Sequence, residues 1–214
     1  IPAYANNDPT RPYHGLIEGD NPISFMDKDI VGFRKFNNKW VQPAASLKYE
    51  IPWVKGLSVK GLFSYDFYVA DNAIFQKEYK QYRYDEASGG YQEFTRQSPN
   101  RISRETYSKT QELAQLSLNY SGKFDKHEVG GLLLWEAQKS SGDNFSAHRD
   151  LILQLPYLFA GIADQQLASM SKGDADFYEN SNLALAGRFN YNFNNTYLAE
   201  FLFRYDGSSK FGSG

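Results

Sequence analysis

A period of two residues runs through much of the chain, and no other feature constrains its fold as strongly. Between residues 183 and 193, Leu, Leu, Gly, Phe, Tyr and Phe alternate with Ala, Ala, Arg, Asn and Asn. Residues 197–205 repeat the pattern with Tyr, Ala, Phe, Phe and Tyr on one side. Weaker forms of it occur in four more segments: 45–51, 57–67, 114–120 and 129–138. Because successive side chains of a strand point to opposite faces, the period predicts β-strands with one apolar and one polar face.

The connections between these segments alternate between short and long. Short turns are expected at 52–56, 122–127 and 194–196, whereas the much longer segments 69–109 and 140–181 separate the strand pairs. Short turns on one side and long loops on the other are typical of a transmembrane β-barrel, while a soluble sandwich has shorter and more even connections. We therefore predict an all-β fold, an antiparallel transmembrane β-barrel segment of about six strands with long external loops.

This pattern divides the chain into strand pairs and external segments. The strand pairs are expected at 43–68, 110–139 and 182–206. The external segments are expected at 1–42, 69–109 (a loop or an extended hairpin), 140–181 and, as the start of a next loop, 207–214. Apolar residues within 150–170 also suggest a short helix that is broken at Pro156.

The composition agrees with a membrane-spanning sheet and argues against several other classes. Aromatic residues make up 16% of the chain and the mean hydropathy is −0.60. No stretch reaches the roughly 20 apolar residues of a membrane-spanning helix, but a spanning strand turns only every second residue to lipid. The absence of cysteine excludes disulfides and thiolate chemistry. A net charge of −2 gives no basic face for nucleic acid, so we expect no nucleic-acid partner.

Aromatic residues gather at both ends of the expected strands. Six lie at the short turns: Trp53, Tyr120, Phe124, Tyr191, Phe193 and Tyr197. Five lie toward the other ends: Tyr65, Phe67, Trp135, Phe203 and Tyr205. Amphipathic rings prefer the headgroup layers of a membrane, so these residues are predicted to form two interfacial girdles. The alternative is that aromatic residues are common at strand ends in any β-protein.

The polar face of the expected strands would line the inside of a barrel. Five residues from the last strand pair are the candidates for contact with a substrate: Arg188, Asn190, Glu200, Arg204 and Asp206. Lys48, Glu50, Lys60 and Asp66 belong to the same face. We expect most of these side chains to pair with one another or with a domain that fills the barrel.

Two longer segments carry a more specific pattern. One runs from Asn37 through residues 49–66, YEIPWVKGLSVKGLFSYD, and the other covers 189–214 and contains the octapeptide RYDGSSKF at 204–211. Their pattern is a strand, a short turn and a second strand, followed by the motif R-x-D-G-S-S-[KR]-F. This succession resembles barrel segments of SusC/RagA-type TonB-dependent transporters. The segment LFAGIADQ at 158–165 is similar to a loop of that family. The resemblance covers nearly the whole chain.

The resemblance implies a 22-stranded barrel in the outer membrane of a Gram-negative bacterium, closed by an N-terminal plug. It also implies a SusD-like surface lipoprotein as partner, energy from TonB, and import of an oligosaccharide or a peptide. The sequence shows no signal peptide, plug or TonB box, so we expect residues 1–214 to be a barrel piece that contacts outer-membrane lipid and reaches TonB only through a missing N-terminal region.

Residue patterns for catalysis or metal binding are weak. His14, His127 and His148 lack the spacing of metal ligands, and no nucleophile motif accompanies any of them. We expect no enzyme activity, no catalytic residue, no metal and no cofactor. Two alternatives stay open: a soluble carbohydrate-binding β-domain whose aromatic rings form one concave patch, and a β-rich hydrolase with two carboxylates at a cleft.

Overall fold

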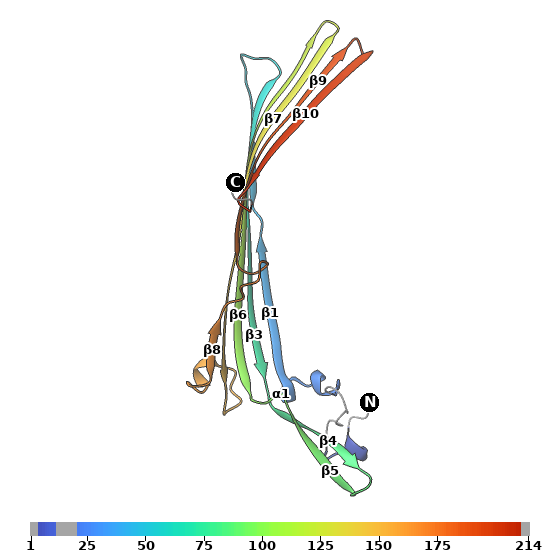
Figure 1. The fold of residues 1–214 in the computed structure, drawn as a ribbon, viewed down its shortest axis with the longest axis vertical. Coiled ribbons are helices and arrows are strands. Elements are labelled where there is room, and N and C mark those ends of the chain that lie inside the picture. Colours follow the sequence, from blue (N-terminus) through green and yellow to red (C-terminus); the bar gives the residue numbers. More distant parts are fainter. Residues whose placement is uncertain (1–3, 12–20, 211–214) are drawn as a thin grey trace. The chain divides into compact units, whose positions relative to one another are not determined.

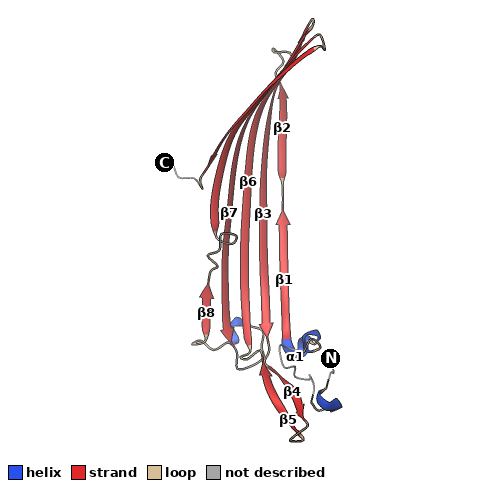
Figure 2. Cartoon of the chain, turned by 45° about the vertical axis from the view of Figure 1, so that its right-hand side comes forward, coloured by secondary structure: helices blue, strands red, loops and turns tan. Residues whose placement is uncertain are grey.

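The computed structural model describes residues 4–11 and 21–210, and within them β-strands dominate. An eight-stranded sheet has the order β1-β3-β6-β7-β9-β10, with β2 beside β3 and β8 beside β7 (Figures 1 and 2). A separate hairpin pairs β4 with β5. The strands of the main sheet are β1 (Gly32–Val41), β2 (Ala44–Glu50), β3 (Leu57–Gln76), β6 (Arg101–Phe124), β7 (His127–Asp150), β8 (Gln166–Ser169), β9 (Tyr178–Phe193) and β10 (Tyr197–Ser208). The hairpin consists of β4 (Tyr79–Asp85) and β5 (Gly90–Arg96).

Helical structure is confined to single turns in the described residues. These are η1 (Ala5–Asn7), η2 (Ser24–Met26), α1 (Lys28–Val31) and η3 (Leu158–Ala160). The short helix suggested within 150–170 is present only as the single 3-10 turn η3, which begins two residues after Pro156. No helix in the described residues has the length and apolar character needed to cross a membrane.

The short turns match the residues that the sequence places there. Asp125 has a φ of 53° in the two-residue turn between β6 and β7, and Asn194 and Asn195 have φ values of 48° and 53° between β9 and β10. Asn and Asp tolerate this left-handed conformation better than other non-glycine residues. Gly56, with a φ of 85°, closes the turn between β2 and β3. These turns set the antiparallel register in which Phe193 pairs with Tyr197.

Several strands extend farther than the alternation predicts. Strand β1 lies within residues 1–42, which were expected to be loop, and β7 continues to Asp150 within the expected loop 140–181. Strand β10 includes Gly207 and Ser208, where a loop was expected to start. Alternation appears only where one face is apolar, so strand portions with polar residues on both faces escape it. Whether these portions lie outside a membrane stays a prediction.

The chain divides into two compact units. Unit 1 comprises the described parts of 1–38, 70–106 and 145–170, and unit 2 the described parts of 39–69, 107–144 and 171–214. Unit 1 has a small core of Phe75, Ile102 and Leu151, against which Phe33 and Leu158 pack.

Candidate functional site: a sheet with two unlike faces

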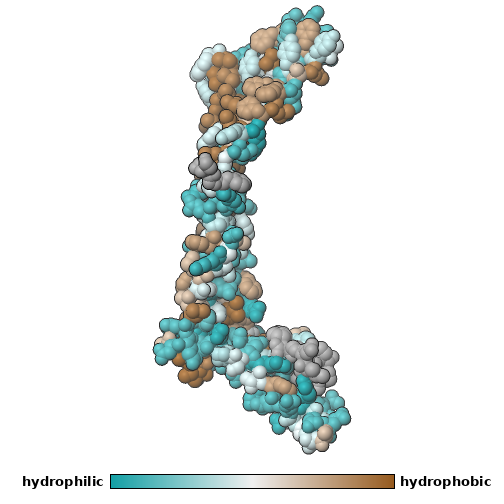
Figure 3. Space-filling view, in the orientation of Figure 1, coloured by the Kyte–Doolittle hydropathy of each residue, from teal (hydrophilic) through white to brown (hydrophobic). Residues whose placement is uncertain are grey.

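One face of the sheet in unit 2 is apolar across three neighbouring strands. The register aligns Trp135 of β7, Leu185 of β9 and Tyr205 of β10 in one row, and places Gly187 beside both Leu133 and Phe203 in the next. These side chains are exposed, and Phe201, for example, keeps 60% of its surface accessible. Apolar residues gather over this part of the sheet in the upper region of Figure 3.

Unit 2 has no hydrophobic core to cover this face. Among its described residues the only buried hydrophobic side chain is Ala184, whereas Leu133, Phe189 and Leu183 are 40%, 49% and 56% exposed. A single-layer sheet normally buries its apolar face against another layer. Exposed apolar patches of this extent mark membrane or protein interaction sites, so the face requires an apolar environment that the described residues do not supply.

The apolar face has a limited height along the strands. Eight residue steps separate Phe193, which pairs with both His127 and Tyr197, from Leu185 in the row of Trp135 and Tyr205. That is about 27 Å along a strand, or about 20 Å across a membrane if the strand is tilted by about 40°. The residues of this face between the two rows carry no charge.

Charged residues begin beyond one further apolar row, in which Ala137 pairs with Leu183. Lys139 of β7 lies on the same face, four residue pairs past Trp135, and its Nζ is 2.8 Å from Oε1 of Glu179 in β9. The alternation does not reveal this ion pair, because Lys139 and Glu179 stand in segments without clear alternation. The pair marks where the face changes from apolar to polar.

The predicted girdle aromatics lie on the apolar side or at its ends. Phe193 and Tyr197 stack at the turn between β9 and β10, with ring centroids 6.4 Å apart. His127, which the sequence left as an ordinary surface residue, joins them: its Nδ1 is 2.6 Å from the Tyr191 hydroxyl and its ring is 4.9 Å from that of Phe193. Trp53 is 78% exposed in the turn between β2 and β3. The interfacial role of these aromatics stays a prediction.

The opposite face of the same strands is polar and internally paired. The guanidinium group of Arg188 donates through Nε and Nη2 to Oε2 of Glu200, at 2.9 and 2.6 Å. Its Nε also lies 3.3 Å from Oδ1 of Asn190. Three of the five predicted polar-face residues are therefore together in one cluster.

The other two predicted residues form a second cluster on this face. Nη2 of Arg204 is 2.8 Å from Oδ1 of Asp206 and 3.8 Å from Oε1 of Glu136 in β7. Gln115 of β6 donates to Oε2 of Glu136 at 2.6 Å. The alternation alone did not identify Glu136, because apolar Leu132 and Leu134 obscure the pattern in β7.

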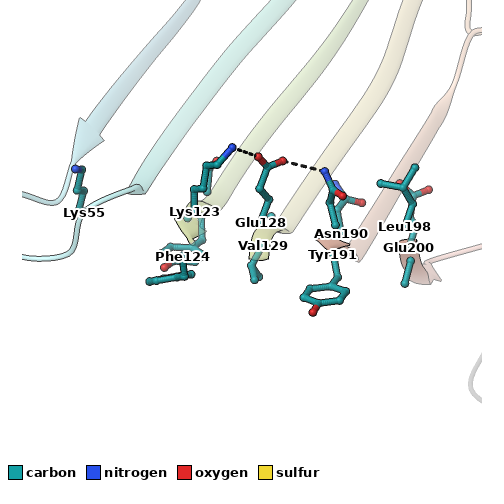
Figure 4. Close-up of a pocket in the computed structure, with 15 residues that line it drawn as sticks. Lys55, Lys123, Phe124, Glu128, Val129, Asn190, Tyr191, Leu198 and Glu200 are labelled. Atoms are coloured by element: carbon teal, nitrogen blue, oxygen red, sulfur yellow. Dashed lines mark hydrogen bonds and ion pairs between the residues drawn. The ribbon is translucent and has the colours of Figure 1, made fainter. Parts of the chain in front are cut away.

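A groove lies on the polar face near the short turns (Figure 4). Two adjoining parts of it have volumes of about 900 and 890 Å³. Lys123 bonds to Glu128 across the β6–β7 turn, and Glu128 accepts a hydrogen bond of 3.0 Å from Asn192. Arg188 and Asn190 line the part that extends toward β2 and β3.

The described residues contain no group of three or more His, Cys, Asp and Glu side chains placed to hold a metal ion. His127 is near the β6–β7 turn, His148 lies opposite Leu167 in the β7–β8 pair, and His14 is outside the described residues.

Comparisons with known proteins place this geometry in a structural context. No family model and no curated protein sequence match the chain. Solved structures do: the RagAB peptide importer in its 'closed-closed' state matches with a TM-score of 0.64 and 21% identity over 95% of this chain. This chain shares the fold of a segment of the RagAB peptide importer. The 'open-open' state of the importer and a structure of the RagAB peptide transporter match with TM-scores of 0.62 and 0.61, at 19% and 18% identity over 97% of the chain.

The chain spans 20% of the length of each RagAB chain that it matches. Within that span, the all-β antiparallel barrel segment predicted from the alternation is confirmed. The resemblance to SusC/RagA-type transporters inferred from residues 49–66 and 189–214 is confirmed at the level of the fold.

Proposed function

We propose that this chain forms part of the wall of an outer-membrane importer in a Gram-negative bacterium. One observation carries the proposal: the uncovered, uncharged apolar face of unit 2 is backed by a polar face whose charges are largely paired. In lipid, backbone groups must be satisfied by hydrogen bonds within the structure, which the paired strands of a closed barrel provide. The apolar face then contacts lipid and the polar face lines an aqueous interior.

In this role the chain supplies a lined passage and no catalytic group. A peptide is the substrate class that we favour, because the matched structures are of a peptide importer. A glycan is the alternative nutrient. A SusD-type lipoprotein as partner and energy supplied through TonB belong to the same proposal, and both would act through the longer protein.

A nitroxide scan of the full-length protein in lipid bilayers tests the membrane assignment. Residues 1–214 contain no cysteine, so, once any cysteine elsewhere in the longer protein is replaced, single-cysteine variants can be labelled at successive positions 186–191 of β9. We expect odd positions to be accessible to oxygen dissolved in lipid and even positions to a water-soluble nickel chelate. Lys139→Cys, at the charged end of the face, should report an aqueous or headgroup environment.

Two results would contradict the proposal. Equal access of the nickel chelate at odd and even positions would mean that the apolar face does not meet lipid. A full-length protein that stays monodisperse in plain buffer would mean that another soluble layer covers the face, and would favour the carbohydrate-binding β-domain.

A further inference from the structure

A short loop, residues 171–177, leads into β9 and departs from the sheet of unit 2. The pairing of β7 with β9 ends at Gly142 and Tyr178, so the loop is outside that register. The loop is closed on itself, because the backbone N–H of Asp176 donates to the carbonyl oxygen of Gly173 at 2.9 Å. Compact surface loops of this kind frequently carry function.

The ends of this loop lie over the polar face of the sheet. Alternation along β7 puts Gly142 and Asn144 on the same face as Glu136, and both are buried. Asp143 between them points to the other face and is exposed. A Cβ atom at Gly142 would lie 3.2 Å from the backbone oxygen of Asp176. The loop is therefore what covers the polar face at this level of β7.

Asn144 holds the two ends of the loop together. Its Nδ2 donates to the backbone oxygens of Ser171 and Asp176, at 2.8 and 3.2 Å, and its Oδ1 accepts from the N–H of Ser171 at 2.6 Å. The Ser171 hydroxyl donates to Oδ2 of Asp176 at 2.9 Å. Only 6% of Asn144 is exposed. A buried, fully bonded amide fixes the groups that it joins in one arrangement.

The loop is far from the groove beside the short turns. Leu132 is the last residue of β7 that lines this groove, and Asn144 lies twelve residues farther, about 40 Å along the strand. The loop therefore belongs to a different level of the polar face. Between its ends it exposes Lys172, Gly173, Asp174 and Ala175.

We infer that residues 171–177 form a fixed constriction of the passage, held by Asn144, that limits the size of the solutes moving along the polar face. The inference rests on the proposed function, in which this face lines an aqueous interior, and adds a size limit to it. The width and the lining groups of a membrane passage set its selectivity. Without the bonds of Asn144, the loop would move aside and admit larger solutes.

Maleimide labelling of the full-length protein in whole cells, with no other cysteine present, tests the inference. The target is Asn182→Cys, an exposed position on the polar face of β9, and the reagents are N-ethylmaleimide and a polyethylene-glycol maleimide. The reference is Glu86→Cys in the exposed β4–β5 turn. The ratio of the labelling rates of the large and the small reagent should be lower at position 182 than at position 86.

Releasing the loop should remove this difference. We expect Asn144→Ala to raise the ratio at position 182 by about fivefold or more, the shift in population that follows from losing one hydrogen bond. Ser171→Ala keeps Asn144 and removes the hydroxyl bond to Asp176, so a smaller rise is expected. This milder variant keeps the test valid if Asn144→Ala does not fold.

Gln115→Ala is the matched control, since Gln115 donates to Glu136 on the same face, away from the loop. It should leave the ratio unchanged.

Three results would overturn the inference: equal ratios at positions 182 and 86, an unchanged ratio in both loop variants, or an equal rise in Gln115→Ala. Each would leave the nitroxide pattern of β9 intact, and thus the membrane assignment. Loss of the nitroxide pattern, with the ratio still raised by Asn144→Ala, would count against the membrane assignment alone.

Discussion

At the scale of single residues, several glycines of unit 2 lie across from aromatic rings. A Cβ atom at Gly187 would come within 2.2 Å of Cε1 of Phe203, its partner in the register. A Cβ at Gly142 would come within 2.5 Å of the ring of Tyr178 in the same way. An aromatic ring that covers a cross-strand glycine shields the backbone there. The sequence shows glycines within the alternating pattern, but only the register reveals which ring each one faces.

Gly187→Ala should therefore destabilise the protein by about 1–3 kcal/mol, because Phe203 must leave its position. The measurement is the urea midpoint of unfolding of the full-length protein in detergent. Gly207→Ala in β10 is the control, since nothing lies within 4 Å of its Cβ position, and it should change stability by less than about 0.5 kcal/mol. Equal effects of the two changes would disprove the packing argument.

Replacing Gly56 with alanine should lower the stability of the protein more than replacing Gly187 does. Its φ is 85°, and a Cβ there would lie 1.9 Å from the backbone oxygen of Ser121, which cannot rotate away as a side chain can. We expect Gly56→Ala to cost roughly 3 kcal/mol or more by the same measurement. Gly61→Ala in β3, where the Cβ position is open, should be far milder. A Gly56→Ala protein as stable as Gly61→Ala would show that the turn can relax.

At the scale of elements, the strand pair β9–β10 could be predicted almost completely, whereas β1 and the distal parts of β6 and β7 could not. In β9 and β10 one face is apolar over the whole pattern, so the period of two is visible. Beyond Lys139, β7 continues with Ser140, Ser141 and Gly142, which carry no contrast between faces. Pairing with β9 keeps this portion extended. Such cross-strand pairing cannot be recognised from a single sequence.

A lysine introduced at neighbouring positions of β7 should lower the stability of the protein by different amounts. Leu133 lies on the apolar face and Leu134 on the polar face. Leu133→Lys should cost about 2–4 kcal/mol near the middle of a bilayer, because the ammonium group meets lipid. Leu134→Lys should cost less than about 1 kcal/mol. Unfolding from lipid bilayers measures both, and equal costs would contradict the two-faced sheet.

In unit 1 a short N-terminal segment is held on the β4–β5 hairpin. The Tyr91 hydroxyl donates to Oδ2 of Asp8 at 3.1 Å, and the guanidinium group of Arg11 lies 5.3 and 5.4 Å from the rings of Tyr82 and Tyr91. The hydroxyl of Thr10, followed by its backbone N–H, holds the pKa of Asp8 below its usual value. Sequence patterns did not reveal this contact, because its partners are more than 70 residues apart along the chain.

The lowered pKa of Asp8 gives a pH dependence with a defined sign. Ionised Asp8 stabilises this segment above its ordinary pKa of about 3.9, and the contribution is lost as the pH falls through the lower value of the folded state. Hydrogen exchange at residues 8–11, corrected for intrinsic rates, should accelerate below about pH 4. Asp8→Asn should remove this dependence, and an unchanged pH profile in that variant would assign the effect to another group.

At the scale of the whole molecule, the two units differ in how they are stabilised. Unit 1 buries Phe75, Ile102 and Leu151, whereas unit 2 leaves its large apolar residues exposed. The sequence predicted the two faces of unit 2 and the residues on them. It could not predict how the polar residues pair, because the pairing of Arg204 with Glu136 depends on strands far apart in sequence.

The full-length protein should therefore need detergent to stay folded and unaggregated. We expect a monodisperse, β-rich species in micelles and aggregation when the detergent is removed, because the apolar face then lacks a cover. Sedimentation with far-UV circular dichroism measures both properties. A cooperative monomer in plain buffer would contradict the expectation.

The unlike faces of the sheet also limit how such a chain can change in length. A single residue inserted into or deleted from β9 would move every later side chain of that strand to the other face, so that Arg188 would lie on the apolar face and Phe189 on the polar face. Two residues added together would keep each side chain on its own face. Single-residue length variation should therefore be tolerated in connections such as Glu86–Gly89 and rejected within the paired strands.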